Sequence, residues 1–146
     1  MDCLFCDFME GKIYEHKKGY PFIINHETEN TLSFLSLDSP VNKEAHILVI
    51  PKQHFTSFEE ISDSVMHELI DHVNLVGRFY RNKKLNYNLL LNNGKHAGQT
   101  VPHTHFHVIP RKKNDKIRIE VWKRAKITPK DFVDLSNKYK KDFSSI

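Results

Sequence analysis

Short runs of apolar, β-branched and aromatic residues recur along the chain, and each run is bounded by Gly, Pro, Asn or Asp. Runs of this length and composition are typical of β-strands, because branched and aromatic side chains pack well on a pleated surface. The pattern predicts five strands, at residues 20–25, 31–37, 45–51, 87–92 and 104–110.

Between the third and fourth predicted strands, apolar residues recur with a different period. Side chains three and four residues apart lie on one face of a helix. Within residues 62–84, apolar or small side chains recur at this spacing, at Met66, Ile70, Val73, Gly77 and Tyr80. We therefore expect one long amphipathic helix that packs on a face of the sheet.

A second helix is predicted near the end of the chain. Thr128 suits an N-cap and Pro129 suits the first helical turn, so the pattern predicts a helix over about 128–141. Strands with helices packed on a face define an α+β fold. The sequence contains no internal repeat and no visible boundary, and we expect a single domain over residues 1–146.

Composition narrows the class of protein. With 146 residues, 39% of them hydrophobic, the chain is large enough to bury one core. It has no apolar run of roughly 18 residues and no signal-peptide pattern near its start. We therefore expect a protein of the cytoplasm that has no membrane partner.

Charge is unevenly distributed along the chain. The formal net charge is +4, but residues 111–126 hold eight Lys or Arg against Asp115 and Glu120, a local charge of +6. Such a stretch can attract an anionic substrate or nucleic acid through its field. Charged stretches are more often solvated surface segments, and we expect no nucleic-acid partner.

Three of the ten histidines occupy alternate positions, at His103, His105 and His107. In an extended strand these side chains would emerge on one face, roughly 6.6 Å apart. A neutral imidazole has a free lone pair near neutral pH, so one ring of such a row can act as a nucleophile or a metal ligand. Its neighbours can orient it or donate hydrogen bonds to an anion.

A polar loop with two glycines leads into this histidine row, in the sequence NNGKHAGQTVP at residues 92–102. Glycine permits unusual dihedral angles and close approach, so such a loop can bring backbone N–H groups against phosphate oxygens. Beside three imidazoles, the loop indicates phosphate chemistry.

Together the loop and the histidine row, NNGKHAGQTVPHTHFHVIPR, resemble the signature of the histidine triad family. The segment at residues 38–54 is similar to a second motif of that family. Cys3-Leu4-Phe5-Cys6 and Val121-Trp122-Lys123 resemble its Hint-like bacterial-type branch, so the likeness covers about residues 3–125. It implies a five-stranded, mostly antiparallel sheet with helices, paired into a homodimer whose two sheets are continuous.

The resemblance also implies a covalent mechanism. His105 would attack the α-phosphorus of a nucleotide derivative and form a nucleotidyl-histidine, which water then hydrolyses. The carbonyl of His103 would hold the proton of His105 on Nδ1, and His107 would donate to the phosphate oxygens that gain charge. His46 matches a fourth histidine of the family, which supports the nucleophile.

Nucleotide contacts follow from the same resemblance. Gln99 and Thr100 would contact the scissile bridging atom and the α-phosphate, with the Thr100 hydroxyl as a donor to the leaving group. Asn92 would bind phosphate, and Asp38 would accept hydrogen bonds from the ribose; the alternative for Asp38 is a turn residue. Purine nucleotides, AMP above all, are implied by the family only. Candidates for an apolar base slot, most of which suit the core equally well, are Phe5, Phe8, Ile13, Phe34 and Leu37.

A metal site is implied by four further positions. Cys3, Cys6, His54 and His103 supply the two thiolates and two imidazoles of a tetrahedral structural zinc site. The pairing of a Cys-x-x-Cys with the first triad histidine rests on the family resemblance. The alternative is two buried free thiols.

Three classes of function fit these motifs. The first is a hydrolase that acts on nucleoside phosphoramidates, aminoacyl adenylates or dinucleoside polyphosphates. The second is a nucleotidyltransferase, which His107 argues against because transferases of this kind typically carry Gln at that position. The third is a nucleotide-binding regulatory module with vestigial activity.

Overall fold

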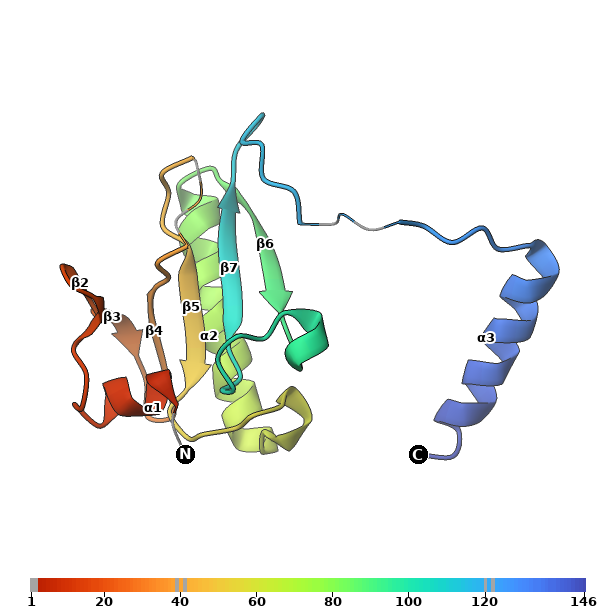
Figure 1. Ribbon diagram of the computed structural model, residues 1–146, viewed down its shortest axis with the longest axis horizontal. Helices are drawn as coiled ribbons and strands as arrows, with labels where there is room; N and C mark the ends of the chain where they lie inside the picture. The colour runs from red at the N-terminus through yellow and green to blue at the C-terminus, as the bar shows by residue number, and fades with distance from the viewer. Residues whose placement is uncertain (1–2, 39, 41, 120, 122) are drawn as a thin grey trace.

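The computed structural model describes residues 3–146 apart from 39, 41, 120 and 122, and Figure 1 shows how its elements are arranged. Its larger sheet has the strand order β3-β4-β5-β7-β6, and every neighbouring pair is antiparallel. These strands are β3 (Ile24–Glu27), β4 (Thr31–Leu35), β5 (Ile47–Pro51), β6 (Asn86–Leu91) and β7 (Phe106–Arg111). The predicted α+β class and five-stranded sheet are confirmed.

The long helix α2 (Asp63–Asn82) covers one face of this sheet, within the predicted range (Figure 1). Strand β5 shows why the sheet has two cores, because successive side chains of a strand point to opposite faces. Ile47 and Val49 share a core with the apolar face of α2. Leu48 and Ile50 belong to a second core, together with residues of α1 (Leu4–Met9).

The prediction of one strand over residues 20–25 is wrong. The chain instead forms a small hairpin of β1 (Glu15–Lys17) and β2 (Tyr20–Pro21), followed by the separate strand β3. Gly19 makes the turn with φ of +82°, a conformation that glycine adopts without steric cost. Pro21 has no N–H to donate to a ladder, so the strand cannot continue through it.

The strand predicted at residues 104–110 begins two residues late. Pairing in β7 starts at Phe106, because the backbone N–H of Thr104 donates to the carbonyl of Phe55 at 2.7 Å instead of joining the sheet. The histidine row therefore straddles the start of the strand. Leu48 lies opposite His107 in the ladder, so His107 faces the same side of the sheet as α1.

The C-terminal helix α3 (Pro129–Phe143) stands apart from the sheet, beyond the edge formed by β6 (Figure 1). The Thr128 side chain accepts a hydrogen bond from the backbone N–H of Asp131 at 3.1 Å, as the N-cap prediction requires. Trp122, and Ser39 and Val41 of the second motif, lie outside the described residues. Among those described, no helix has both the length and the apolar character needed to cross a membrane.

Candidate active site

The imidazole of His105 is held by the backbone two residues before it. Its Nδ1 lies 2.7 Å from the carbonyl oxygen of His103. A carbonyl oxygen only accepts, so Nδ1 carries the proton and Nε2 keeps a free lone pair. His105 is 4% exposed, and burial lowers its pKa, which favours the neutral ring. The arrangement presents an unprotonated ring nitrogen on a fixed imidazole.

A second chain of hydrogen bonds joins the neighbouring imidazoles. Nδ1 of His46 donates to the carbonyl oxygen of Asp38 at 2.8 Å, which leaves Nε2 of His46 as an acceptor. Nδ1 of His107 lies 3.0 Å from that Nε2 and must donate to it. The rings of His105 and His107 are close, with centroids 4.8 Å apart.

The remaining nitrogen of His107, Nε2, is a buried atom to which the described part of the chain offers no partner. Its Nε2 has no hydrogen bond to any described residue. Burial first, and then the neighbouring His105 and His46, lower the pKa of His107 to about 4. An uncompensated buried polar atom costs stability, so its presence here points to a ligand that supplies the missing partner.

The loop before the histidines is closed by Gln99. Its side-chain oxygen accepts from the backbone N–H of Gly94 at 2.7 Å, and its nitrogen donates to the carbonyl of Thr56 at 2.9 Å. Asn92 donates to the carbonyl of Gly98 at 3.5 Å, across the same turn. In this structure Asn92 and Gln99 hold the loop in place, while Thr100 is exposed.

Asn93 is a structural residue of this loop that the sequence motif did not single out. Its side-chain oxygen accepts from the backbone N–H of Phe58 at 2.8 Å, and its nitrogen donates to Glu59 at 2.9 Å. Both partners lie in η1 (Phe58–Glu60), so Asn93 fastens the loop to the segment before α2. The only signal in the sequence is the second Asn of an Asn-Asn-Gly turn.

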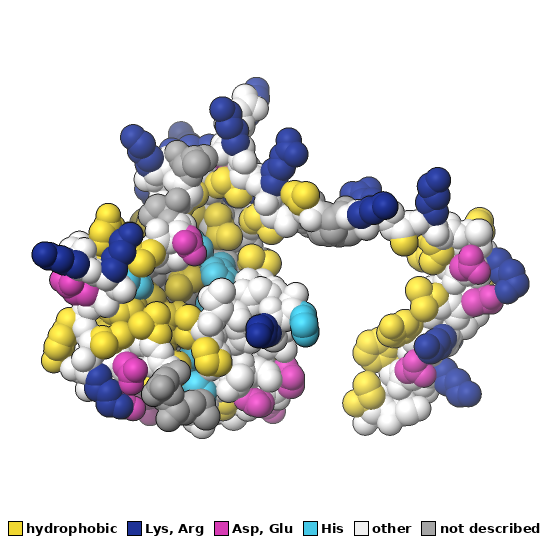
Figure 2. Space-filling model, in the orientation of Figure 1, with side chains coloured by type: hydrophobic (Ala, Val, Ile, Leu, Met, Phe, Trp, Pro, Cys, Tyr) yellow, Lys and Arg dark blue, Asp and Glu magenta, His cyan; other side chains and the backbone are white. Residues whose placement is uncertain are grey.

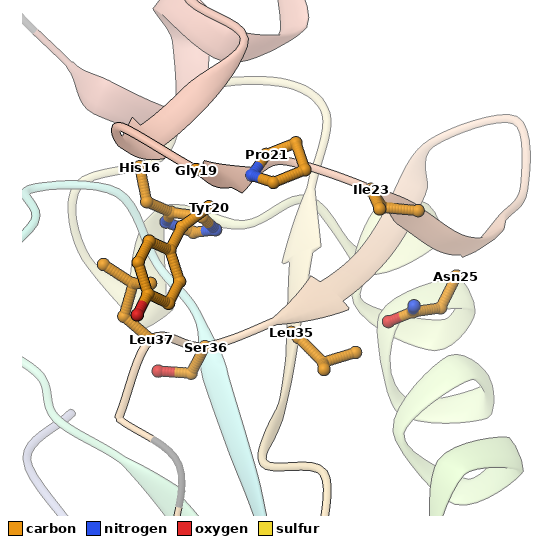
Figure 3. Close-up of a pocket in the computed structure, with 9 residues that line it drawn as sticks. All are labelled: His16, Gly19, Tyr20, Pro21, Ile23, Asn25, Leu35, Ser36 and Leu37. Carbon is orange, nitrogen blue, oxygen red and sulfur yellow. The ribbon is translucent and has the colours of Figure 1, made fainter.

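A pocket of about 290 Å³ opens at the end of β4, where Leu35, Ser36 and Leu37 line it (Figure 3). The exposed side chain of Leu37, the residue before Asp38, lines it together with His16 and Tyr20. Tyr20 and His16 come from the hairpin β1–β2 and project over Ser36 and Leu37 (Figure 3). Neither aromatic ring was predicted to take part in the site.

The other candidates for the base slot belong to the core. Phe5 and Phe34 are 3% and 0% exposed, and Phe8 and Ile13 pack against the same cluster. Leu37 is the one predicted slot residue that lines the pocket. The structure therefore brings Leu37 to the pocket and leaves the four remaining candidates in the core cluster.

Four potential metal ligands converge at the N-terminal end of the site. Nδ1 of His103 lies 3.6 Å from Sγ of both Cys3 and Cys6, and Nδ1 of His54 lies 3.3 Å from Sγ of Cys6. All four donor atoms lie within 4.8 Å of one another. Tetrahedral zinc with bonds of roughly 2.0–2.3 Å requires donor separations of about 3.3–3.8 Å.

The chemistry of this cluster also fits a metal ion. Nε2 of His103 donates to the carbonyl of Pro51 at 2.8 Å, so its lone pair lies on Nδ1, the nitrogen that faces the thiols. Such a hydrogen bond from the far ring nitrogen is the usual support of a metal-bound histidine. Burial and the adjacent Cys3 raise the pKa of Cys6 to about 11, and a bound cation would offset both effects.

Phe5 connects the two groups of histidines. Its ring packs edge to face on His103 and on His105, with centroids 5.7 and 5.4 Å away. Phe5 is also part of the Cys-x-x-Cys helix α1. The N-terminal helix therefore supports the nucleophile candidate through packing as well as through the cluster of thiols and imidazoles.

Comparison with known proteins finds relatives that match most of the chain. The family model "HIT domain" matches residues 21–114. The chain is 36% identical over 132 residues to adenosine 5'-monophosphoramidase hnt1 of Schizosaccharomyces pombe, covering 90% of each protein. It is 34% identical over 116 residues to adenylylsulfatase HINT3 of Arabidopsis thaliana, covering 78% of this chain and 54% of that one.

A solved structure shares the fold over nearly the whole chain. The crystal structure of a HIT family member from Bacillus subtilis superposes with a TM-score of 0.77 at 31% identity, covering 97% of this chain and 96% of that chain. The protein belongs to the histidine triad family. Family membership and the named relatives support hydrolase chemistry on nucleotides in general terms.

Proposed function

We propose that this protein hydrolyses purine nucleotide derivatives at the α-phosphate through a covalent nucleotidyl-histidine. The observation that carries the proposal is the 2.7 Å hydrogen bond from Nδ1 of His105 to the carbonyl of His103. It leaves Nε2 of a neutral, buried imidazole as the available nucleophile. The substrate class is AMP joined to an amine, an acyl group or a second phosphate.

In the first step, Nε2 of His105 forms a bond to the α-phosphorus. The bond from phosphorus to the leaving group breaks, and the leaving nitrogen or oxygen keeps the electron pair and takes a proton, for which the Thr100 hydroxyl is the donor. Charge grows on the phosphoryl oxygens, and His107 supports it through Nε2. Because Nδ1 of His107 donates to His46 at 3.0 Å, Nε2 can donate only if the ring becomes an imidazolium.

In the second step, a water molecule attacks the same phosphorus and gives up a proton, which restores the Thr100 hydroxyl. The bond to Nε2 of His105 breaks, its electron pair returns to the ring, and AMP leaves with the oxygen of water. The carbonyl of His103 keeps the proton on Nδ1 throughout, so the ring can serve as nucleophile and then as leaving group. Each step is a displacement at phosphorus that needs positioning and charge stabilisation more than bond polarisation.

Recognition of the nucleoside is proposed to fall to Asp38 and the adjacent pocket. The Asp38 carboxylate would accept from the ribose hydroxyls, while its backbone carbonyl holds His46 at 2.8 Å. The purine would enter the pocket of about 290 Å³ and pack against Tyr20, His16 and Leu37. One short segment, residues 36–38, would then set the base, the ribose and the phosphate-binding histidines in register.

A structural zinc ion would be held by Cys3, Cys6, His54 and His103. Bound there, the ion would supply binding energy that stabilises the fold, and the four ligands would fix the His103 ring whose backbone holds the nucleophile. The alternative of two buried free thiols predicts no metal and titratable thiols. The dimer of the family likewise enters here as a proposal.

The decisive experiment captures the intermediate. Enzyme mixed with AMP phosphoramidate is quenched without acid and digested, and the peptides are weighed. We expect the mass of AMP on the peptide that contains His105, and its absence in His105→Ala. If His105→Ala keeps more than about a hundredth of wild-type turnover, the covalent mechanism is excluded. A panel with AMP-lysine, diadenosine polyphosphates and 5′-adenylated DNA then ranks the leaving groups.

A further inference from the structure

The thiols of Cys3 and Cys6 differ in their access to solvent. Cys3 is 1% exposed, whereas Cys6 is only partly buried. Their sulfur atoms lie within 4.8 Å of each other, and the sequence contains no third cysteine. An oxidant can therefore reach Cys6 first, and Cys3 is the one thiol of the chain that can then react with it.

The start of α1 spaces the two cysteines for a direct bond between their sulfur atoms. The Cys3 carbonyl accepts the first hydrogen bond of the helix, from the backbone N–H of Asp7 at 2.9 Å. Residues three apart in a helix have Cα atoms roughly 5 Å apart. Disulfides join Cα atoms that are about 4.4–6.8 Å apart, so the bond can form while the helix stays intact.

The imidazole of His103 depends on these thiols. Its Nε2 donates to the carbonyl of Pro51 at 2.8 Å, so Nδ1 can only accept. Nδ1 lies 3.6 Å from each sulfur atom, and the described residues offer it no other donor. A disulfide carries no proton, so oxidation would leave Nδ1 unpaired in a side chain that is 0% exposed. A buried acceptor without a partner is costly, and we therefore expect the ring to move.

A bound zinc ion would leave this dependence in place. Zinc takes thiolates as ligands, and a disulfide supplies none. Oxidation would remove two of the four ligands of the cluster and leave only His54 and His103. With or without the ion, Nδ1 of His103 loses its partner when the sulfur–sulfur bond forms.

Two contacts connect this change to the proposed nucleophile. The backbone carbonyl of His103 accepts from Nδ1 of His105 at 2.7 Å. Phe5, which lies between the two cysteines in the sequence, packs edge to face on both histidine rings, with centroids 5.7 and 5.4 Å away. A shift at His103 or at the start of α1 therefore alters the hydrogen bond that fixes the His105 proton on Nδ1.

The surroundings of Cys6 favour a neutral oxidant. The carboxylates of Asp7 and Glu10 act on the charge of Cys6. Lys12 pairs with them at 3.4 and 2.5 Å, so one net negative charge remains. Figure 2 shows apolar side chains gathered on the face that carries α1, with charged side chains at their margin. Hydrogen peroxide is small and neutral, whereas glutathione disulfide is large and anionic and would be repelled.

We propose that Cys3 and Cys6 are a site of reversible oxidation by hydrogen peroxide and that their disulfide switches off the site at His105. The sulfur of Cys6 attacks one oxygen of the peroxide, and the O–O bond breaks. The leaving hydroxide takes the proton of the thiol and forms water, and Cys6 becomes a sulfenic acid. Control of turnover rests on the proposed function, whereas the oxidation of the thiols does not.

A base assists the first step. Burial and the adjacent Cys3 raise the pKa of Cys6 to about 11, so its proton must be removed before the sulfur attacks. Nδ1 of His54 lies 3.3 Å from Sγ of Cys6 and can carry that proton to the leaving hydroxide.

Cys3 completes the reaction. Its sulfur attacks the sulfur of the Cys6 sulfenic acid, the S–O bond breaks, and hydroxide leaves with the Cys3 proton as a second water. The two thiols give up two electrons and two protons, and one peroxide becomes two water molecules.

The first experiment follows the thiols by mass. The full chain, zinc-loaded or metal-free, is treated with hydrogen peroxide and weighed intact and after digestion. We expect a loss of about 2 Da per chain, a bond between Cys3 and Cys6 within one peptide, release of zinc, and recovery with dithiothreitol. A disulfide between two chains, sulfinic acid on Cys6 as the first product, faster reaction with glutathione disulfide, or no reaction at peroxide levels that oxidise free cysteine would overturn the proposal.

Single substitutions test the order of the two steps. Cys3→Ser leaves no second thiol, so Cys6 should accumulate as a sulfenic acid that dimedone labels. Cys6→Ser leaves only the buried Cys3, and its labelling should be at least about tenfold lower. Equal labelling of the two variants would contradict the proposal.

The last measurement follows His105 itself. In protein with ¹⁵N-labelled histidine, the Nδ1–H resonance of His105 should be protected from exchange in the reduced form, shift or vanish on oxidation, and return with dithiothreitol. Turnover of AMP phosphoramidate should fall at least about tenfold and recover in parallel, because the nucleophile loses its position. The control, Cys3→Ser/Cys6→Ser, should show neither response to peroxide.

The two proposals fail in different ways. A disulfide that forms but leaves the His105 resonance and turnover unchanged would refute the switch. A reduced protein that forms no AMP adduct would contradict the proposed function, while the mass of the oxidised chain and the His105 resonance still decide the oxidation and its reach.

Discussion

The carbonyl oxygen of His103 accepts a hydrogen bond of 2.7 Å from Nδ1 of His105, while the ring of His103 lies 3.6 Å from the thiols of Cys3 and Cys6. One residue thus belongs to two sites. Its backbone holds the proposed nucleophile, and its ring belongs to the proposed zinc cluster. Substitution of the cysteines should therefore lower turnover as well as the stability of the fold.

Removal of both thiols should release the metal and lower stability together. We expect wild-type protein to carry about one zinc per chain and Cys3→Ser/Cys6→Ser to carry none. The melting temperature should fall, because the binding energy of a structural metal is folding energy. Turnover should fall as well, because the His103 backbone shifts with its ring. Elemental analysis, calorimetry and a phosphoramidase assay make the three measurements.

The control for this variant is His96→Asn, which alters an exposed histidine of the polar loop outside the cluster. Its zinc content should equal that of the wild type. Wild-type protein that lacks zinc after purification without chelators, with both thiols freely titratable, would favour the alternative of two buried free thiols.

Loss of the Asp38 carboxylate should weaken binding and spare the chemical step. A carboxylate that accepts from ribose hydroxyls stabilises the ground state and the transition state about equally. Asp38→Ala should therefore raise KM by the equivalent of about 1–3 kcal/mol, the cost of a charge-assisted hydrogen bond, with a much smaller change in kcat. Steady-state kinetics with AMP phosphoramidate measures both constants.

A substrate that lacks the ribose hydroxyls provides the matched control. With a 2′,3′-dideoxy nucleotide, wild type and Asp38→Ala should bind almost equally. If Asp38→Ala binds AMP as the wild type does, the side chain is a turn residue, and only its backbone carbonyl, which accepts from His46 at 2.8 Å, serves the site.

Binding of AMP should be coupled to the uptake of a proton by the His107 ring. In the free protein, burial and the neighbouring imidazoles lower the pKa of this ring to about 4, so it is neutral at pH 7. An anionic phosphate beside Nε2 stabilises the imidazolium and raises the pKa in the complex. Between the two pKa values the complex therefore holds one more proton, and affinity weakens as pH rises through this interval.

Calorimetry in several buffers measures that proton. At about pH 7.5 the AMP phosphate is almost fully ionised, so the ligand contributes little proton exchange of its own. The observed enthalpy should vary with the ionisation enthalpy of the buffer for wild type, and this dependence should shrink in His107→Asn. A wild-type enthalpy that is the same in every buffer would contradict the assignment.

The fold was predictable in segments where the hydrophobic period of the sequence matches the burial of the side chains. Strand β5 alternates between two cores and helix α2 presents one apolar face, so period and burial agree in each. The prediction failed at residues 20–25, where composition indicated a strand but Gly19 and Pro21 divide it into a hairpin and a separate strand. Local conformational restrictions outweighed β propensity there.

For the site, the family resemblance implied the residues and also the hydrogen bond from Nδ1 of His105 to the carbonyl of His103. It did not indicate that Thr104 leaves the sheet and donates to the carbonyl of Phe55 at 2.7 Å. Tyr20 reaches the pocket through a hairpin that no motif describes. Contacts of this kind join distant segments of the chain, and a single sequence carries no direct signal for them.

His72 should make the protein sensitive to mild acid. It lies on the buried face of α2, 3% exposed, with Nδ1 2.8 Å from the Thr31 hydroxyl and Nε2 3.0 Å from the Ser33 hydroxyl. Burial and the nearby His26 ring, 4.9 Å away, lower its pKa to about 4. Glu68 opposes this shift weakly from the same helix.

The sign of the effect follows from the lowered pKa. The unfolded chain binds a proton at His72 near its ordinary pKa of about 6.5, whereas the folded chain resists protonation down to about 4. The contribution of neutral His72 to the free energy of unfolding is therefore fully present above about pH 6.5. It is lost as pH falls toward 4, at up to about 1.4 kcal/mol per pH unit for this one proton.

Urea unfolding at a series of pH values should show that slope. The His72→Gln substitution should reduce the slope by the contribution of one proton. The matched control is His67→Gln, because His67 is exposed on the same helix. An unchanged slope in His72→Gln would place the acid sensitivity in other buried histidines.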